Sequence, residues 1–381
     1  MQDSNQVPEI EAQCPVANVS QLCQNANMIQ RTRIFASLSL LVGAVAACSN
    51  PAETADAPEA AEATPTLTLY SSRHYDSDKA LFAMFEEQAG VKINVREASA
   101  DQLIETMKAE ADMSPADVII TADAGSLWRF QDAGLTQPLL SETLTEVVPE
   151  NYREPDGHWY GMARRLRGIA YDPARWNADE LATWDTLASE DKAGEICVRS
   201  SSNIYNLSLM GELIHRYGSE AAGEWATSIV GNMARNPQGG DTDQIRAIAA
   251  GECSIAIVNH YYWVRLGASA AETDQQVAAS TSFLVPEFTE GSGSHVNITG
   301  AAVTVTADNP VLAETFLAFL LSETGQSYLT TETKELPLLD TTALPDGVEA
   351  VPAFVASDVN LGVYGENQAE AQRLFDIAGW N

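Results

Sequence analysis

The chain has few positively charged residues. Its 381 residues contain 21 lysines and arginines against 53 aspartates and glutamates, which gives a formal net charge of -32 at pH 7. Proteins that bind nucleic acid neutralise phosphates with cationic side chains, so this composition excludes nucleic acid as a partner. An acidic surface mainly serves solubility, and it also raises the concentration of cations near the protein.

The sequence also lacks an apolar run long enough to cross a membrane, which takes about 20 residues. The apolar stretch Ile34 to Ala47 is shorter; it follows the basic segment Met28 to Arg33 and ends in small residues directly before Cys48. This pattern predicts a lipoprotein signal peptide over residues 28–47, whose cleavage leaves a lipidated Cys48. We therefore expect a periplasmic protein held at a membrane by a lipid anchor.

Two other segments lack the composition of a folded domain. Residues 1–27 carry acidic residues and no targeting signal. We interpret them as a mis-called extension, with a short disordered tail as the alternative. Residues 48–65 are rich in Ala, Glu and Pro and are expected to form a disordered tether. Residues 66–381 remain, enough for one large domain or two lobes.

Cysteine is scarce, with five in the chain. Cys14 and Cys23 precede the predicted start and Cys48 is assigned to lipidation, which leaves Cys197 and Cys253. Both lie at the opening of strand-like apolar runs, so in an oxidising compartment they can pair in one sheet. The alternative is two buried free thiols.

Alternating strand and helix patterns predict an α/β fold. A strand at Leu67 to Tyr70 is followed by helical periodicity over Ser77 to Gln88, which stops at Gly90, and by a second strand at Lys92 to Val95. A similar series begins at Arg167. We expect two lobes, each a mostly parallel sheet flanked by helices, with a cleft outside the carboxyl ends of the strands.

Tyrosines and a histidine follow the ends of three predicted strands. His74 and Tyr75 follow the first strand, while Tyr205 and the pair Tyr261 and Tyr262 follow two later ones. Phenolate oxygen is a hard ligand suited to a highly charged cation, whereas adjacent phenols in a core would each need a buried partner. Taken alone, the His-Tyr pair is more often a surface or packing feature. The three segments together suggest a hard metal site.

Six stretches, in order along the chain, resemble the periplasmic ferric-ion-binding proteins of iron ABC transporters, the FutA-like group. The resemblance runs from Tyr70 to the C-terminus and implies a type II periplasmic-binding-protein fold. Its lobes would be residues 66–165 with 297–340, and residues 166–296 with 341–381. The matching stretches are Tyr70 to Tyr75, Arg165 to Asp172, Cys197 to Asn206, Gly251 to Tyr262, His295 to Gly300 and Phe375 to Trp380.

The resemblance also implies a cargo and its ligands. Arg165 matches a family arginine near the metal, but Arg164 and Arg167 flank it, so which of the three faces the cleft stays open. We expect ferric iron as the transported ion, with ferrous iron left open and no synergistic anion. The implied metal ligands are His74, Tyr75, Tyr205, Tyr261 and Tyr262.

This interpretation makes the chain a monomeric substrate-binding lipoprotein, not an enzyme, that delivers iron to a permease and its ATPase. One alternative keeps the fold and changes the cargo to an anion or another small solute, with Ser71, Ser72 and helix N-termini as donors. Another alternative is a hydrolase or metal-dependent enzyme. Against it, the sequence has no Gly-x-Ser-x-Gly elbow, no His-Glu-x-x-His motif and no phosphate-binding glycine loop.

Some polar residues have simpler interpretations. His158 and His215 lack companion ligands at a useful spacing and are assigned to surface or packing positions. Asp123 and Asp241 could support a metal site from outside its ligands, although solvated loops are the simpler expectation.

Overall fold

The computed structural model describes residues 64–73, 75–288 and 291–381. The predictions for the signal peptide, Cys48, the tether and His74 fall on residues outside this description. Residues Thr64–Asn381 form one unit by their contacts. No helix within the described ranges combines the length and apolarity needed to cross a membrane.

The first predicted elements are confirmed. Strand β1 (Thr66–Ser71) buries Leu67 and Leu69, and helix α2 (Asp78–Ala89) ends at Gly90 in the left-handed conformation that glycine adopts without strain. Helix α3 (Ala100–Glu110) begins with a capping box, in which Ser99 and Gln102 bond each other's backbone.

The remaining elements alternate along the chain. The other strands are β2 (Lys92–Glu97), β3 (Val118–Thr121), β4 (Tyr160–Tyr171), β5 (Ile196–Cys197), β6 (Ile255–Asn259), β7 (Ser282–Leu284) and β8 (Val296–Val303). The other helices are α4 (Ala124–Asp132), α5 (Glu142–Val147), α6 (Ile204–Asn232), α7 (Asp241–Ala249), α8 (His260–Gly267), α9 (Glu272–Ala279), α10 (Pro310–Leu320), α11 (Glu323–Thr333), α12 (Gly362–Glu366) and α13 (Gln368–Ala378). The 3-10 helices are η1 (Ala111–Met113), η2 (Glu150–Tyr152), η3 (Ala178–Leu181), η4 (Trp184–Ala188), η5 (Glu190–Lys192) and η7 (Val348–Ala350).

The strands follow the order β2-β1-β3-β8-β4-β6-β5, with β7 paired to β4. Pairs β1–β2, β1–β3 and β5–β6 are parallel, whereas every pair that involves β4 or β8 is antiparallel. We expected mostly parallel sheets, but β4 and β8 run antiparallel to the strands beside them. Apolar runs reveal that a strand is buried, but they do not encode its direction.

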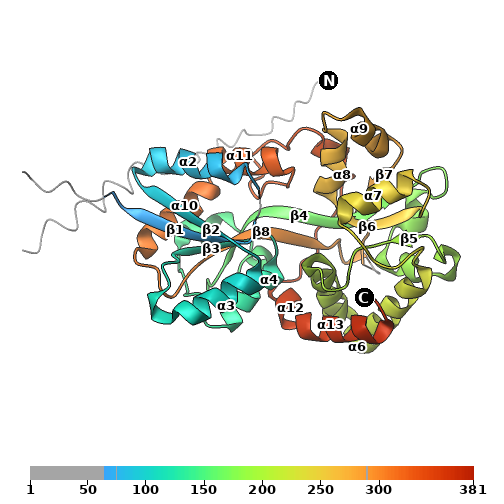
Figure 1. Ribbon diagram of the computed structural model, residues 1–381, viewed down its shortest axis with the longest axis horizontal. Helices are drawn as coiled ribbons and strands as arrows, with labels where there is room; N and C mark the ends of the chain where they lie inside the picture. Colours follow the sequence, from blue (N-terminus) through green and yellow to red (C-terminus); the bar gives the residue numbers. More distant parts are fainter. Residues whose placement is uncertain (1–63, 74, 289–290) are drawn as a thin grey trace, which may run out of the picture. The chain divides into compact units, whose positions relative to one another are not determined.

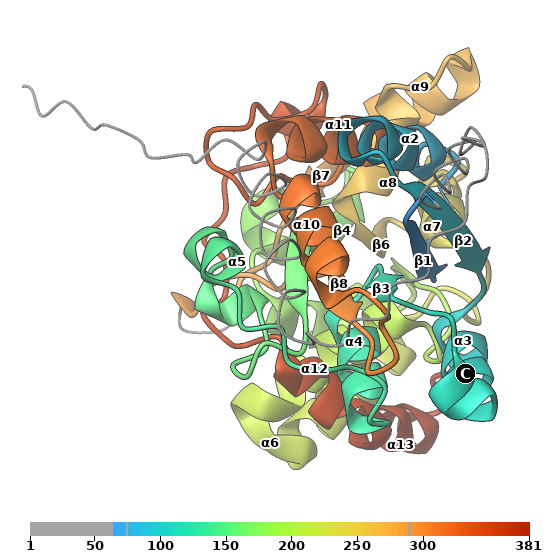
Figure 2. The same cartoon turned by 90° about the vertical axis from the view of Figure 1, so that its left-hand side faces the viewer.

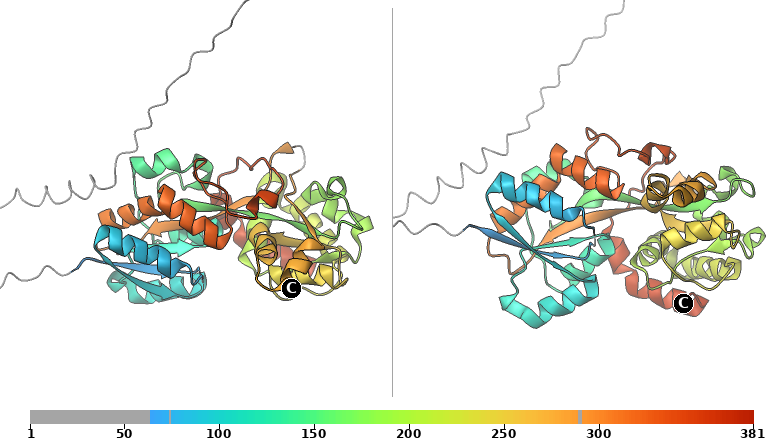
Figure 3. Two further views of the ribbon diagram at one scale, coloured as in Figure 1. Left: turned by 90° about the horizontal axis from the view of Figure 1, so that it is seen from above. Right: turned by 45° about the horizontal axis from the view of Figure 1, so that its top comes forward.

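Strands β4 and β8 connect two separate apolar cores. The first core packs around β1 and β3 and includes Leu69, Phe85 and Phe316, whereas the second packs around β6 and includes Trp184 and Trp225. In Figure 1, β4 and β8 extend from the group with α2 and α3 to the group with α7 and α8, and Figure 3 shows the same two groups from other sides. The first part of β4 pairs with β8, and its last part, from Arg167, pairs with β6.

Helix α12 packs against both α4 and α6, which belong to different cores. These helices lie together on one side of the molecule in Figures 1 and 2. Gly365 permits the approach, because a Cβ there would meet the Trp128 side chain at 2.4 Å. Helix α6 is interrupted at Gly218, which has a non-helical backbone with φ of 82°.

Cys197 on β5 and Cys253 before β6 form a disulfide across 56 positions of sequence. Both cysteines lie in a small apolar cluster that also contains Ala256 and Val258 of β6. The cross-link therefore ties together the two parallel strands of the second core.

Candidate metal centre

Four tyrosines approach one another from three segments. Tyr75 follows β1, Tyr205 lies in the first turn of α6, and Tyr261 and Tyr262 lie in the first turn of α8, directly after β6. Asn203 caps α6, because its side-chain oxygen accepts the backbone N–H of Tyr205 at 3.1 Å. The position of His74 lies outside the described residues.

Arg165 lies at the centre of this group. Its Nη2 donates hydrogen bonds to the Tyr75 hydroxyl at 3.1 Å and to the Tyr261 hydroxyl at 2.6 Å. Its guanidinium carbon is 5.3 Å from the centre of the Tyr205 ring. The Arg165 side chain is only 1% exposed. One buried cation therefore contacts tyrosines from all three segments.

The other two candidate arginines have different partners. Arg164 donates from Nε to the carbonyl oxygen of Pro337 at 2.9 Å. Arg167 is buried and donates to the Asp241 carboxylate at 2.9 Å. Of the three arginines, Arg165 is the one that bonds the hydroxyls of Tyr75 and Tyr261, which favours it as the arginine of the predicted site.

Burial raises the pKa of the Tyr261 and Tyr262 phenols above the usual value for tyrosine, and Arg165 partly opposes this shift. The two rings are in contact, with centroids 4.5 Å apart. The Tyr261 oxygen accepts a second hydrogen bond from Nδ2 of Asn259 at 2.9 Å. At neutral pH both phenols therefore hold their protons, and an incoming cation has to displace them.

Asp123 and Asp241 are both buried, so the expectation of solvated loops was wrong. Asp241 accepts hydrogen bonds from Arg167 and from the backbone N–H of Asn259, directly before the tyrosine pair. Asp123 caps α4 and bonds Ser208 of α6. In each case a carboxylate opens a helix beside a buried strand, and this signal could have identified both.

Two further charged residues at this site escaped the sequence analysis. Arg265 lies on α8, and its guanidinium carbon is 5.0 Å from the ring centres of both Tyr75 and Tyr261. Its spacing of four and three residues after the tyrosine pair was the available signal, because such residues share a helix face. Glu335, fully buried after α11, forms ion pairs with Arg73 and Arg165. We find no pattern in the sequence that singles it out.

His158 and His215 occupy surface or packing positions, as the sequence predicted. His215 is exposed, and Nδ1 of His158 lies 2.9 Å from the Thr136 hydroxyl. Within the described part of the chain, no three His, Cys, Asp or Glu side chains gather as a metal-binding group. The oxygen atoms that the tyrosine group brings to one point are the Tyr75 and Tyr261 hydroxyls, which share Nη2 of Arg165.

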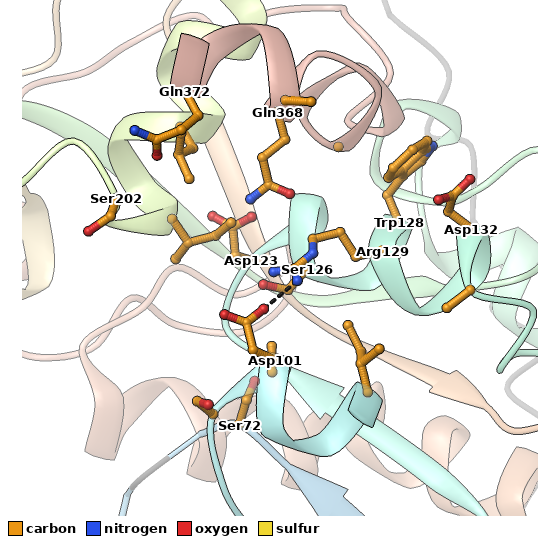
Figure 4. A pocket seen from close by; sticks show the side chains of 18 of the residues that line it. Ser72, Asp101, Asp123, Ser126, Trp128, Arg129, Asp132, Ser202, Gln368 and Gln372 are labelled. Carbon is orange, nitrogen blue, oxygen red and sulfur yellow. Dashed lines mark ion pairs between the residues drawn. The ribbon is translucent and has the colours of Figure 1, made fainter. Parts of the chain in front are cut away.

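A cavity of about 1280 Å³ opens beside Tyr205. Figure 4 shows its polar lining, with Ser72, Asp101 and Arg129 facing Ser202 and Gln368. Asp101 and Arg129 form an ion pair on its wall. Of the four tyrosines, Tyr205 lines this cavity, which is large enough to hold a hydrated ion or a small chelate.

A family model for bacterial extracellular solute-binding proteins matches residues 80–356. The chain belongs to this family. Among relatives of this solute-binding protein, Iron uptake protein A2 of Synechocystis sp. (strain ATCC 27184 / PCC 6803 / Kazusa) is 42% identical over 316 residues, which are 83% of this chain and 90% of that protein. The Major ferric iron-binding protein of Neisseria meningitidis serogroup B (strain ATCC BAA-335 / MC58) is 27% identical and matches 83% of this chain and 95% of its own length.

A solved structure of a Trichodesmium protein named IdiA or FutA, in complex with iron and citrate ligands, is similar to this solute-binding protein with a TM-score of 0.80. It is 41% identical, and the match covers 83% of this chain and all of that one. The resemblance to FutA-like proteins and the type II periplasmic-binding-protein fold are thereby confirmed.

Proposed function

We propose that this solute-binding protein captures ferric iron in the cleft between its two lobes and delivers it to a membrane permease. The observation that carries the proposal is the convergence of Tyr75, Tyr205 and Tyr261 around the guanidinium of Arg165. The ligands that we assign to iron are His74, Tyr75, Tyr205, Tyr261 and Tyr262.

The chemistry of the donors fits a trivalent cation. A phenol ionises near pH 10 in water, but a trivalent ion at bonding distance strongly favours the phenolate. Two to four phenolates offset the charge of ferric iron, and Arg165 moderates any excess negative charge through its hydrogen bonds. The two donors that already reach the Tyr261 oxygen, from Arg165 and Asn259, also favour its anionic form.

The lobes that we propose are residues 66–165 with 297–340, and 166–296 with 341–381. Helix α12 qualifies the last boundary, because Val363 and Tyr364 pack on the first core whereas Leu374 and Phe375 of α13 pack on the second. We therefore move the boundary after residue 340 to the junction between α12 and α13, where the chain passes from the first core to the second. Iron favours the closed state because Tyr75 and Tyr261 come from different lobes.

A relative in Serratia marcescens is named an Fe(3+)-binding periplasmic protein, and we extend this location to the present chain. We propose that it acts as a monomer, anchored to a membrane through a lipid on Cys48, with an ABC permease and its ATPase as partners. It is a transport protein and not an enzyme.

The form of the cargo has one alternative. The Trichodesmium relative holds citrate together with iron, which weighs against our expectation of no synergistic anion. The polar cavity beside Tyr205 has room for a carboxylate chelator. A small anion alone, the other solute considered, would use Ser71, Ser72 and helix N-termini as donors but would leave four phenols without a role.

Absorption spectroscopy tests the proposal. Ferric iron bound to phenolate has a visible charge-transfer band, so the purified protein should become coloured when ferric iron is added as a weak chelate. The variants Tyr261→Phe and Tyr262→Phe should weaken or shift the band. Tyr328→Phe is the control, because Tyr328 packs against the first core on α11, away from the tyrosine group.

A protein that stays colourless after ferric loading, with no loss of metal in Tyr262→Phe, contradicts the proposal. Repeating the titration with and without citrate separates bare iron from a chelate. If citrate or another anion binds with equal affinity in the absence of iron, the cargo is the anion.

A further inference from the structure

The chain turns a corner directly after α11, at Thr333 to Glu335. Lys334 has a left-handed backbone with φ of 61°, and its N–H donates to the Thr330 carbonyl at 2.7 Å. A side chain other than glycine adopts this conformation at a cost of about 1 kcal/mol. The turn directs Glu335 into the interior, where its side chain is 0% exposed.

Glu335 lies between two arginines. Its Oε2 accepts a hydrogen bond from the Thr299 hydroxyl at 2.7 Å. Its Oε1 lies 3.6 Å from Nη1 of Arg73 and 3.5 Å from Nε of Arg165. Among the described residues, neither Oε1 of Glu335 nor Nε of Arg165 has a hydrogen-bond partner. Two buried, oppositely charged groups therefore face each other with these atoms free to pair.

The arginines beside the corner are the ones that contact the tyrosine group. Arg165 bonds the hydroxyls of Tyr75 and Tyr261, and Arg73 lies 4.8 Å from the Tyr75 ring centre. At the other end of the corner, the Thr333 carbonyl accepts a hydrogen bond from Nη2 of Arg265 at 2.6 Å. Residues of this turn therefore contact three arginines beside the proposed iron site, Arg73, Arg165 and Arg265.

We propose that Glu335 is a positioning residue for iron binding, whose carboxylate holds Arg165 through Nε so that Nη2 reaches the phenol oxygens. The inference rests on the proposed function. Without the carboxylate, the positive charges of the buried Arg73 and Arg165 repel each other. A glutamine in place of Glu335 would also bring an amide N–H against the Nε–H of Arg165, and two donors cannot pair. Arg165 then withdraws, and the iron-bound phenolates lose a charge-assisted hydrogen bond.

The test compares Glu335→Gln with Glu332→Gln, a matched control on the exposed side of α11. Proteins loaded with ferric iron are mixed with excess EDTA, and both the release rate and the position of the charge-transfer band are recorded. Glu335→Gln should release iron about tenfold faster. A tenfold change corresponds to the loss of about one charge-assisted hydrogen bond between Arg165 and a phenolate. Its band should move to longer wavelength, because a phenolate without a hydrogen-bond donor gives up electron density more readily. The control should match the wild type.

A double variant shows whether Glu335 acts through Arg165. The release rate of Arg165→Gln should be faster than wild type, and adding Glu335→Gln should change it less than twofold. If the two effects multiply instead, Glu335 does not act through Arg165 and the inference is wrong. Glu335→Asp, which keeps the charge, should restore most of the band position.

The experiment separates this inference from the proposed function. A wild-type protein without a band refutes the proposed function, whereas a normal wild-type band that Glu335→Gln leaves unchanged refutes only the inference. If Glu335→Gln does not fold, Thr299→Val decides. It removes the donor to Oε2, together with the acceptor of a hydrogen bond from Nη1 of Arg73, but it keeps the charge of Glu335. The band should shift in the same direction by a smaller amount, and an unshifted band refutes the inference.

Discussion

In the proposed iron site, each phenol that binds the metal has to release its proton. Burial raises the pKa of Tyr261 and Tyr262, so both are protonated over the whole physiological range. Because protons compete with iron for these oxygens, the apparent affinity for ferric iron should increase as the pH rises from about 6 to about 8. Competition with a chelator of known pH dependence measures this slope.

The number of protons released provides the control for this prediction. Calorimetry in buffers with different ionisation enthalpies counts them, and Tyr262→Phe should release about one proton fewer than the wild type. An affinity that is independent of pH, after correction for the chelator, would show that the phenols are not ligands.

A second pH effect, on the free energy of unfolding, is expected from Asp123. It is buried, its carboxylate accepts hydrogen bonds from Ser208 and Asn297, and burial raises its pKa to about 7. Between the usual pKa of aspartate, about 4, and about 7, the folded protein holds a proton that the unfolded chain has lost. This group therefore contributes stability at low pH that is lost as the pH rises through that window.

The variant Asp123→Asn should remove this contribution. Urea unfolding at about pH 5 and about pH 7.5 should show a smaller loss of stability with rising pH in Asp123→Asn than in the wild type. Equal slopes in the two proteins would mean that Asp123 is ionised in the folded state throughout.

At the scale of elements, the pairing of β4 with β7 depends on a glycine. A Cβ at Gly168 would meet the Phe283 ring at 2.4 Å and the Leu284 carbonyl oxygen at 2.5 Å. Gly168→Ala should therefore lower the free energy of unfolding by about 1–3 kcal/mol, because β7 must move away. It should also weaken iron binding, since Arg167 and Arg165 precede this position on the same strand.

Gly231→Ala on α6 is the matched control. No atom lies within 4 Å of a Cβ there, and alanine is the better helix former by about 1 kcal/mol. Denaturant midpoints of the two variants should thus move in opposite directions. A Gly168→Ala protein as stable as the wild type would contradict the close approach of β7.

Sequence patterns predicted elements well where one local signal was sufficient. The strand at Leu67 to Tyr70, the stop at Gly90 and the strand that begins at Lys92 all appeared as expected. Helix α8 was not recognised because its eight residues follow directly on β6. Short helices carry too few periodic positions to identify them.

At the scale of the whole molecule, iron should close the two lobes. Tyr75 follows β1 of the first core and Tyr261 follows β6 of the second core, so in the proposed site a shared iron ion links the lobes. Small-angle scattering should show a lower radius of gyration for the iron-loaded protein than for the iron-free protein. The double variant Tyr75→Phe/Tyr261→Phe should lose this decrease, and Tyr328→Phe should keep it.

The sequence by itself determined the fold class, the segments that carry the tyrosines, and the arginine region between residues 164 and 167. These features depend on local composition, on strand and helix periodicity, and on motifs in a recognisable order. The resemblance of six stretches to ferric-ion-binding proteins specified the kind of cargo to expect, which no composition or spacing alone could supply.

Only the tertiary structure decided which charged groups surround the tyrosines. Arg165 rather than Arg164 or Arg167 bonds their hydroxyls, and Glu335 reaches Arg165 across 170 positions of sequence only because Lys334 turns it inward. A buried charge without a partner is costly, so it pairs with an oppositely charged residue. Which residue lies close enough to do so depends on the fold. Distance along the chain carries no information about such a choice.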